Sequence, residues 1–180
     1  MNLQNAVILS FVLVAIAHAD PGPDELLFLT IPGAEKITPD GWAIPTLDKI
    51  PQELQKLFSH YDWGGPDGSV PKEIHGFCFD LKHEGKNAYF ITNLALSGSG
   101  GTGYMVFYQF PNGWKQIADF QGPLYRYPTK QNTWPILVWT GRGGGGVWSK
   151  SYLKYSNGEY RTYAFQYYDR GIITWKEPKF

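Results

Sequence analysis

The chain contains the same glycine-rich hairpin pattern twice, 45 residues apart. The first copy extends over residues 97–114 and the second over residues 141–160. In each copy a glycine run precedes a strand-like segment rich in aromatic residues, and an Asn-Gly pair follows at Asn112-Gly113 or Asn157-Gly158. Asn-Gly readily supplies the positive φ angles that a tight hairpin turn needs. A period of this length is typical of four-stranded propeller blades and related β units, so the repeat predicts antiparallel hairpins.

Composition supports a β fold with tight turns. Aromatic residues make up 17% of the chain, which also has 21 Gly and 13 Pro. Aromatic side chains favour strands, and glycine and proline favour turns. One helix is expected at Pro51–Tyr61, because Leu54, Leu57, Phe58 and Tyr61 recur at helical spacing and form one apolar face.

We therefore expect a mainly β fold of twisted antiparallel sheets with one short helix. Two repeated units are too few to close a propeller ring, which usually has four to eight blades. The alternatives are an incomplete propeller-like arrangement and a two-sheet arrangement. The internal repeat covers about residues 90–120 and 135–165, within a single β-rich domain at 20–180.

The first 19 residues resemble a secretory signal peptide. An apolar run at Ala6–Ile16 is followed by Ala17-His18-Ala19, which has the small-residue pattern of a cleavage site. The run is shorter than the 20 or so residues that cross a bilayer. This pattern predicts a secreted or periplasmic protein without a membrane span.

Charge narrows the range of partners. Sixteen Lys and Arg balance sixteen Asp and Glu, so the net charge is zero and a nucleic-acid or anionic-membrane partner is disfavoured. Cys78 is the single cysteine, so no internal disulfide can form. We expect Cys78 in the core, as cysteine is often buried; the alternative is a reactive thiol or a bridge between chains.

The repeat also assigns faces to the strands. Lys150 and Lys154 indicate that their face of the second hairpin points outward, so Tyr152 between them and Phe107, its counterpart in the first hairpin, should be exposed. Aromatic residues and arginine are enriched at binding hot spots. The predicted binding residues are Arg142, Trp148, Phe107, Tyr152 and Trp114. The alternative is that most of the tryptophans are in the core.

The segment Asp80–Lys86 has the shape of a calcium-binding loop. Asp80 and Glu84 lie where oxygen ligands are expected, and Gly85 suits the sharp turn. Lys82 places a cation at a ligand position. We therefore expect a plain turn that kept the loop shape without the ion, and no cofactor; calcium bound by Asp80 and Glu84 is the alternative.

No other motif indicates catalysis or a cofactor. Both glycine runs fit the dinucleotide fingerprint G-x-G-x-x-G, but strands rather than helices follow them, so nucleotide binding is disfavoured. His60, His75 and His83 lack the spacing of a known metal motif, and no G-x-S-x-G elbow occurs.

One stretch resembles a known class of proteins. The segments FDLKHEGKNAYFITN, SGSGGTGYMVFYQF and NGWKQIADFQG, between Phe79 and Gly122, resemble small secreted bacterial proteins with FG-GAP-like repeats. The resemblance implies an adhesive role for related architectures, and a role as lysozyme inhibitor for some small periplasmic members.

These observations predict a secreted or periplasmic, non-enzymatic binding protein whose partner is a protein or a glycan. Three alternatives remain open: a lysozyme-type enzyme inhibitor, a secreted hydrolase with a site built from loops, and a surface adhesion or structural protein. The oligomeric state is open as well.

Overall fold

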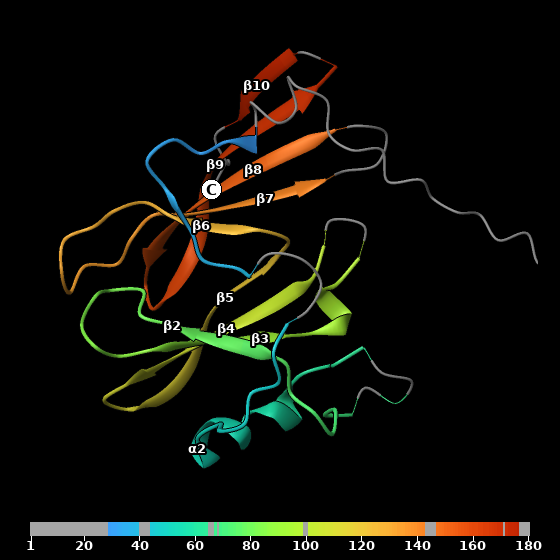
Figure 1. Cartoon of the computed structure of the whole chain (residues 1–180), viewed down its shortest axis with the longest axis vertical. Helices are drawn as coiled ribbons and strands as arrows, with labels where there is room; N and C mark the ends of the chain where they lie inside the picture. Colours follow the sequence, from blue (N-terminus) through green and yellow to red (C-terminus); the bar gives the residue numbers. More distant parts are fainter. Residues whose placement is uncertain are drawn as a thin grey trace, which may run out of the picture.

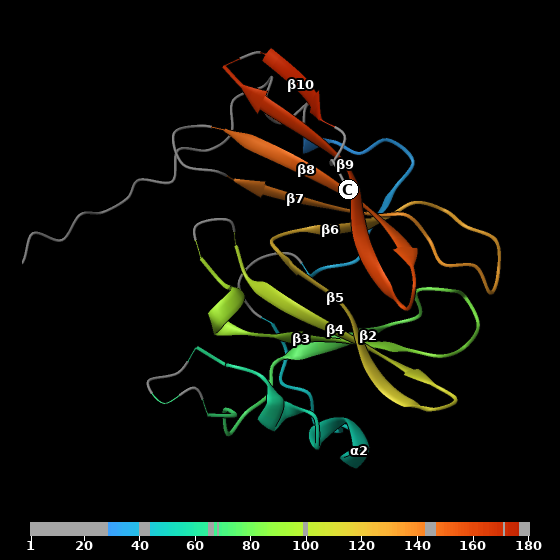
Figure 2. The same cartoon turned by 180° about the vertical axis from the view of Figure 1, so that it is seen from behind.

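Two antiparallel sheets and a short helical segment form the protein (Figures 1 and 2). The computed structural model describes residues 29–39, 44–64, 67, 69–98, 101–142, 147–170 and 172–176. The predicted signal peptide lies outside these residues. The mainly β fold with one short helix is confirmed, and of the two expected architectures the two-sheet arrangement is the one observed.

The larger sheet has six strands in the order β1-β6-β7-β8-β9-β10. Its strands are β1 (Glu35–Lys36), β6 (Leu124–Arg126), β7 (Leu137–Arg142), β8 (Trp148–Ser156), β9 (Glu159–Asp169) and β10 (Ile172–Lys176). The smaller sheet has the order β2-β3-β4-β5, with β2 (Gly76–Phe79), β3 (Ala88–Thr92), β4 (Gly103–Phe110) and β5 (Gly113–Gln121). The two repeated hairpins, β4-β5 and β8-β9, therefore belong to different sheets.

The two hairpins turn at different points relative to their Asn-Gly pairs. Between β8 and β9 the turn is Asn157-Gly158, with φ angles of 54° and 85°. Two positive φ angles in a two-residue loop are the signature of a type I′ turn. Between β4 and β5 the turn is Pro111-Asn112, and Gly113 already pairs with Phe110 as the first residue of β5. The sequence repeat is thus shifted by one residue at the turn.

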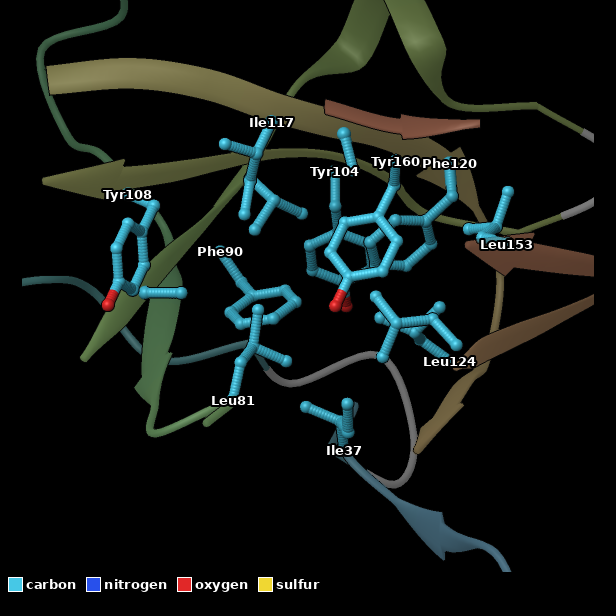
Figure 3. Packing of buried hydrophobic residues seen from close by; sticks show 14 residues of the cluster. Ile37, Leu81, Phe90, Tyr104, Tyr108, Ile117, Phe120, Leu124, Leu153 and Tyr160 are labelled. Atoms are coloured by element: carbon cyan, nitrogen blue, oxygen red, sulfur yellow. The ribbon is translucent and has the colours of Figure 1, made fainter. Parts of the chain in front are cut away.

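The main core lies between the sheets (Figure 3). The smaller sheet contributes Val106 and Tyr108 from β4, and the larger sheet contributes Leu153 and Tyr160. Figure 3 shows Tyr108, Leu153 and Tyr160 together with Phe90 and Leu124, converging from strands of both sheets. Tyr108 and Leu153, at equivalent positions of the two hairpins, both face the core, as alternation with the predicted outward positions Phe107 and Tyr152 requires.

A second apolar cluster covers the other side of the smaller sheet. It forms where α2 (Gln52–Gln55) and the 3-10 helix η1 (Phe58–His60) pack against that sheet. Leu54 and Phe58 are buried one helical turn apart, as the apolar spacing predicts. The predicted helix Pro51–Tyr61 is shorter than expected, because the chain tightens into a 3-10 turn after Lys56. A further 3-10 turn, η2 (Leu94–Leu96), follows β3.

The expected exposure of Phe107 is wrong. Its side chain is fully buried, with its ring centre 6.1 Å from that of Phe58 and 5.6 Å from that of Tyr61. Alternation along β4 does turn Phe107 away from the main core, but the helical segment covers that face. A contact between segments so far apart in the chain leaves no local signal in the strand.

The expected burial of Cys78 is wrong as well. Cys78 is exposed on β2, which is an edge strand of the smaller sheet. Its neighbour Phe77 faces the core and stacks on Phe90, with ring centres 4.7 Å apart. Because successive side chains point to opposite faces of a strand, Cys78 points away from the main core.

A buried arginine joins three segments that are distant in sequence. Arg126 of β6 is only 4% exposed, and its Nη1 donates a hydrogen bond of 2.9 Å to the backbone carbonyl of Asp80. Its Nη2 pairs with the carboxylate of Glu35 in β1. The guanidinium also lies 4.6 Å from the ring centre of Phe79. Arg126 thus links β1, β6 and the loop that follows β2.

Candidate binding face

Three of the five predicted binding residues lie on one face of the six-stranded sheet. Arg142 pairs with Trp148 in the register of β7 and β8, and its guanidinium lies 5.3 Å from the centre of the Trp148 ring. Tyr152 follows on the same side of β8, because it is an even number of residues further along. We call this side, which faces away from the main core, the outer face.

Tyr152 is the centre of an aromatic group on the outer face. Its ring stacks on Trp175 of β10, with centres 5.6 Å apart, and lies 6.3 Å from the ring of Tyr163 in β9. Its hydroxyl contacts Oε1 of Gln166 at 3.3 Å. Burial raises the pKa of Tyr152, and the neighbouring phenols Tyr127 and Tyr163 raise it further. The Tyr152 hydroxyl therefore stays protonated around neutral pH and can donate a hydrogen bond.

Exposed apolar side chains are concentrated beside this group. Among the described residues, three of the seven large exposed hydrophobic side chains lie beside it: Tyr163 of β9, and Ile173 and Trp175 of β10. Ile172 is also exposed, but alternation along β10 places it on the opposite face. Trp175 is 61% exposed. A contiguous exposed apolar patch on a protein surface marks an interaction site more often than isolated exposed residues do.

Lys150 lies on the outer face but is not at the surface. It is 6% exposed, and its ammonium donates a 3.0 Å hydrogen bond to the backbone carbonyl of Thr30. Desolvation lowers the pKa of Lys150. Both lysines therefore lie on the face predicted to point outward. The segment around Thr30 covers Lys150, whereas Lys154 is exposed.

The other two predicted binding residues lie elsewhere. Phe107 is buried beneath the helical segment. Trp114 of β5 belongs to the smaller sheet, where it is half-buried and meets Tyr89 edge to face at 5.4 Å. Neither residue adds to the outer face. Trp175 and Tyr163 are not among the predicted binding residues, although the apolar residues Ile173 and Trp175, two positions apart, indicate a strand with both side chains on one face.

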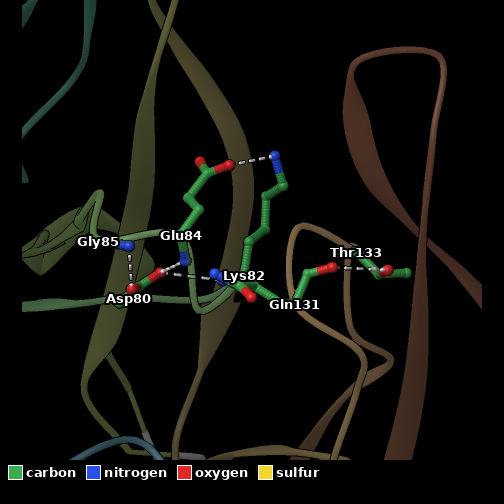
Figure 4. A network of polar contacts seen from close by, with 6 residues as sticks. All are labelled: Asp80, Lys82, Glu84, Gly85, Gln131 and Thr133. Carbon is green, nitrogen blue, oxygen red and sulfur yellow. Dashed lines mark hydrogen bonds and ion pairs between the residues drawn. The ribbon is translucent and has the colours of Figure 1, made fainter.

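The carboxylates of the calcium-type loop make hydrogen bonds and an ion pair within the loop itself (Figure 4). Asp80 accepts hydrogen bonds from the backbone nitrogens of Lys82, Glu84 and Gly85, the last at 2.7 Å. Glu84 pairs with the ammonium of Lys82 at 2.8 Å. Burial acts to raise the pKa of Asp80, but the three backbone bonds and the nearby His83 outweigh it, so this pKa lies below the ordinary value. Lys82 thus occupies the position of a cation in the loop.

In the ranges that the structure describes, no group of three or more His, Cys, Asp or Glu side chains is arranged to hold a metal ion. Within the same ranges, no helix is both long and apolar enough to cross a membrane.

Comparison with known proteins finds no matching family model, no similar curated protein and no similar solved structure. The resemblance to proteins with FG-GAP-like repeats stays a prediction.

Proposed function

We propose that this is a secreted or periplasmic binding protein that recognises a protein partner through its outer face. The observation that carries the proposal is the stack of Tyr152 on the largely exposed Trp175, with the exposed Tyr163 of β9 and Ile173 of β10 beside it. Aromatic anchors of this kind dominate the energetics of protein interfaces. Arg142 over Trp148 adds the other residue type enriched at such anchors.

The strand arrangement favours a protein over a glycan at this face. β10 is the edge of the six-stranded sheet, and no strand within the described residues pairs with its outer side. An edge strand presents unpaired backbone donors and acceptors, which an extended segment of a partner can satisfy by adding a strand. Ile173 and Trp175 would then supply the apolar contacts beside the new strand.

The proposal is tested by capturing partners from envelope or host extract with the mature protein and with its Trp175→Ala variant. Loss of the exposed indole should weaken capture of a specific partner at least about tenfold, as expected for an interface hot spot. Leu94→Ala is the matched control, because Leu94 is 71% exposed on η2, outside both sheets. Equal capture by Trp175→Ala and the unaltered protein, or an equal loss with Leu94→Ala, would overturn the proposal.

A further inference from the structure

A groove of about 620 Å³ lies between the two sheets, where β5 meets β7 and β9. Its floor is the edge of the main core, formed by Ile117, Leu153 and Tyr160 (Figure 3). The small side chains Ala118 and Thr162 leave the space open. The volume is within the range of sites that bind small ligands, about 300–1,000 Å³.

Trp139 forms an aromatic wall of this groove. Trp139 is half-buried and packs on the main core, so the protein covers one part of its side chain and leaves the other part accessible. Its ring also lies close to Gly141, where an added Cβ would come within 2.7 Å of the ring atom Cζ3. Glycine at position 141 thus lets the indole lie against the strand, which fixes the orientation of the ring.

The aromatic surface continues along the same face of the larger sheet. Trp139 pairs with Ser151 in the register, and Ser151 pairs with Phe165, so the three side chains share one face. Phe165 stacks on Tyr167 with ring centres 6.1 Å apart, and both rings are half-buried. A ligand longer than the groove can therefore extend over further aromatic rings.

The rim of the groove is rich in hydrogen-bond acceptors. Its lining residues bear two carboxylates and two amides: Glu159 of β9, and Gln116, Asp119 and Gln121 of the edge strand β5, whose register with β4 places these three on the side of the strand away from the main core. Gln116 and Gln121 use their amide nitrogens on the protein, in hydrogen bonds to the backbone carbonyls of Ala118 and Gly101. Their amide oxygens face no donor in the bonds identified for the described residues, which leaves acceptors for a ligand.

The charges at the rim disfavour an ionic ligand. Arg161 donates to Oε1 of Glu159 from Nε at 2.8 Å and from Nη2 at 2.6 Å, so the charge of Glu159 is already paired. No Lys or Arg side chain is among the described residues that line the groove, which disfavours phosphate or carboxylate ligands. The remaining carboxylate, Asp119, is exposed and lies 3.4 Å from the amide nitrogen of Gln116.

We propose that this groove binds a short neutral oligosaccharide, independently of the protein partner of the outer face. A sugar ring presents an apolar face that can lie on Trp139, and hydroxyl groups at its edge that can donate to the acceptors of the rim. An aromatic wall with a few convergent polar groups is the usual composition of a ligand site.

The proposal is tested by titrating the mature protein with three neutral hexasaccharides while following the heat of binding by calorimetry. The probes are the β-1,4-linked hexamers of glucose and of N-acetylglucosamine, and the α-1,4-linked hexamer of glucose; spermidine serves as a cationic probe. At least one hexasaccharide should bind saturably with a dissociation constant below about 1 mM. Absence of saturable binding by all three sugars, or tighter binding of spermidine, would overturn the proposal.

Variants locate the binding. Trp139→Ala should weaken sugar binding at least about tenfold. Because that change also removes a core contact, Asp119→Asn and Glu159→Gln provide milder changes at the rim, each expected to weaken binding by about threefold or more. Trp175→Ala, on the outer face, is the matched control and should bind the sugar as the unaltered protein does. Binding that survives all three groove changes, or that is lost with Trp175→Ala, would contradict the assignment to this groove.

Discussion

Replacing Phe107 by alanine tests how the helical segment and the smaller sheet pack. The Phe107 side chain is fully buried and contacts the rings of Phe58 and Tyr61. Burying a phenylalanine contributes about 1.5–3 kcal/mol, and each aromatic pair adds about 0.5–1.5 kcal/mol. With the cavity left behind, Phe107→Ala should lower the free energy of unfolding by about 3–5 kcal/mol.

Tyr152→Ala is the matched change at the corresponding position of the second hairpin. Tyr152 is half-buried on the outer face, and its largest contacts are with Trp175 and Tyr163. Its loss should cost only about 1–2 kcal/mol, because solvent already reaches part of the ring. The two variants should therefore differ by about 1–4 kcal/mol, although the sequence repeat makes the positions equivalent.

Urea denaturation followed by circular dichroism measures both changes. The midpoint should fall further for Phe107→Ala than for Tyr152→Ala, with the slope of free energy against urea unchanged in both variants. In a thermal melt the larger loss corresponds to a decrease in Tm on the order of 10 °C. A loss of less than about 1 kcal/mol for Phe107→Ala, or equal losses in the two variants, would refute the packing described for the helical segment.

Four further tests address separate parts of the structure. In urea denaturation, Gly64→Ala should be at least about 2 kcal/mol more destabilising than Gly33→Ala. Both glycines have a positive φ, but only at Gly64 would an added Cβ overlap the backbone of η2. Equal losses of stability in the two variants would contradict that contact. The pKa of Asp80 is lowered, so its backbone bonds stabilise the fold above pH 3.8 and lose this effect as the pH falls through the lower, folded-state pKa. The unaltered protein should therefore exceed Asp80→Asn in free energy of unfolding by less in acid than at neutral pH. A difference between the two proteins that does not change with pH would contradict the hydrogen bonds described for the loop. Calcium should leave the Tm unchanged, because Lys82 already fills the loop, whereas a Tm that rises with calcium would show a site there. Arg126→Ala should cost about 3 kcal/mol in the same urea assay, because it leaves buried carbonyls without a donor. Glu35→Gln should cost less than Arg126→Ala, because position 35 is half-exposed and the amide oxygen of glutamine can still accept a hydrogen bond from Nη2 of Arg126; equal costs would contradict this arrangement.

Local patterns predicted much of the β architecture. Leu54 and Phe58 lie on the buried side of the helical segment, as their spacing predicts, and the inward face of both hairpins follows from alternation along β4 and β8. These features depend on residues that are close together in the sequence, so they can be inferred from spacing alone. The position of the turn in the first hairpin is an exception, because proline and glycine allow the loop to form at either of two registers.

Long-range contacts explain what the sequence did not predict. The pairing of β1 with β6 joins residues about 90 positions apart, and Arg126 is buried only because Glu35 and the carbonyl of Asp80 meet it there. Phe107 is buried by a segment that precedes it by about 50 residues. The same holds for the candidate site. Arg142 and Trp148 are near neighbours in the chain and could be predicted together, whereas the stacking of Tyr152 on Trp175 depends on the order of the strands in the sheet.

Site-specific photo-crosslinking tests the central claim most directly, that a protein partner binds the outer face beside β10. A benzoylphenylalanine introduced in place of Tyr163, which is exposed beside Tyr152, should form a covalent adduct with one partner protein in envelope or host extract. The same crosslinker in place of Leu94, on η2, should form no such adduct. An adduct with the same partner from position 94 and none from position 163 would contradict the assignment of the binding surface.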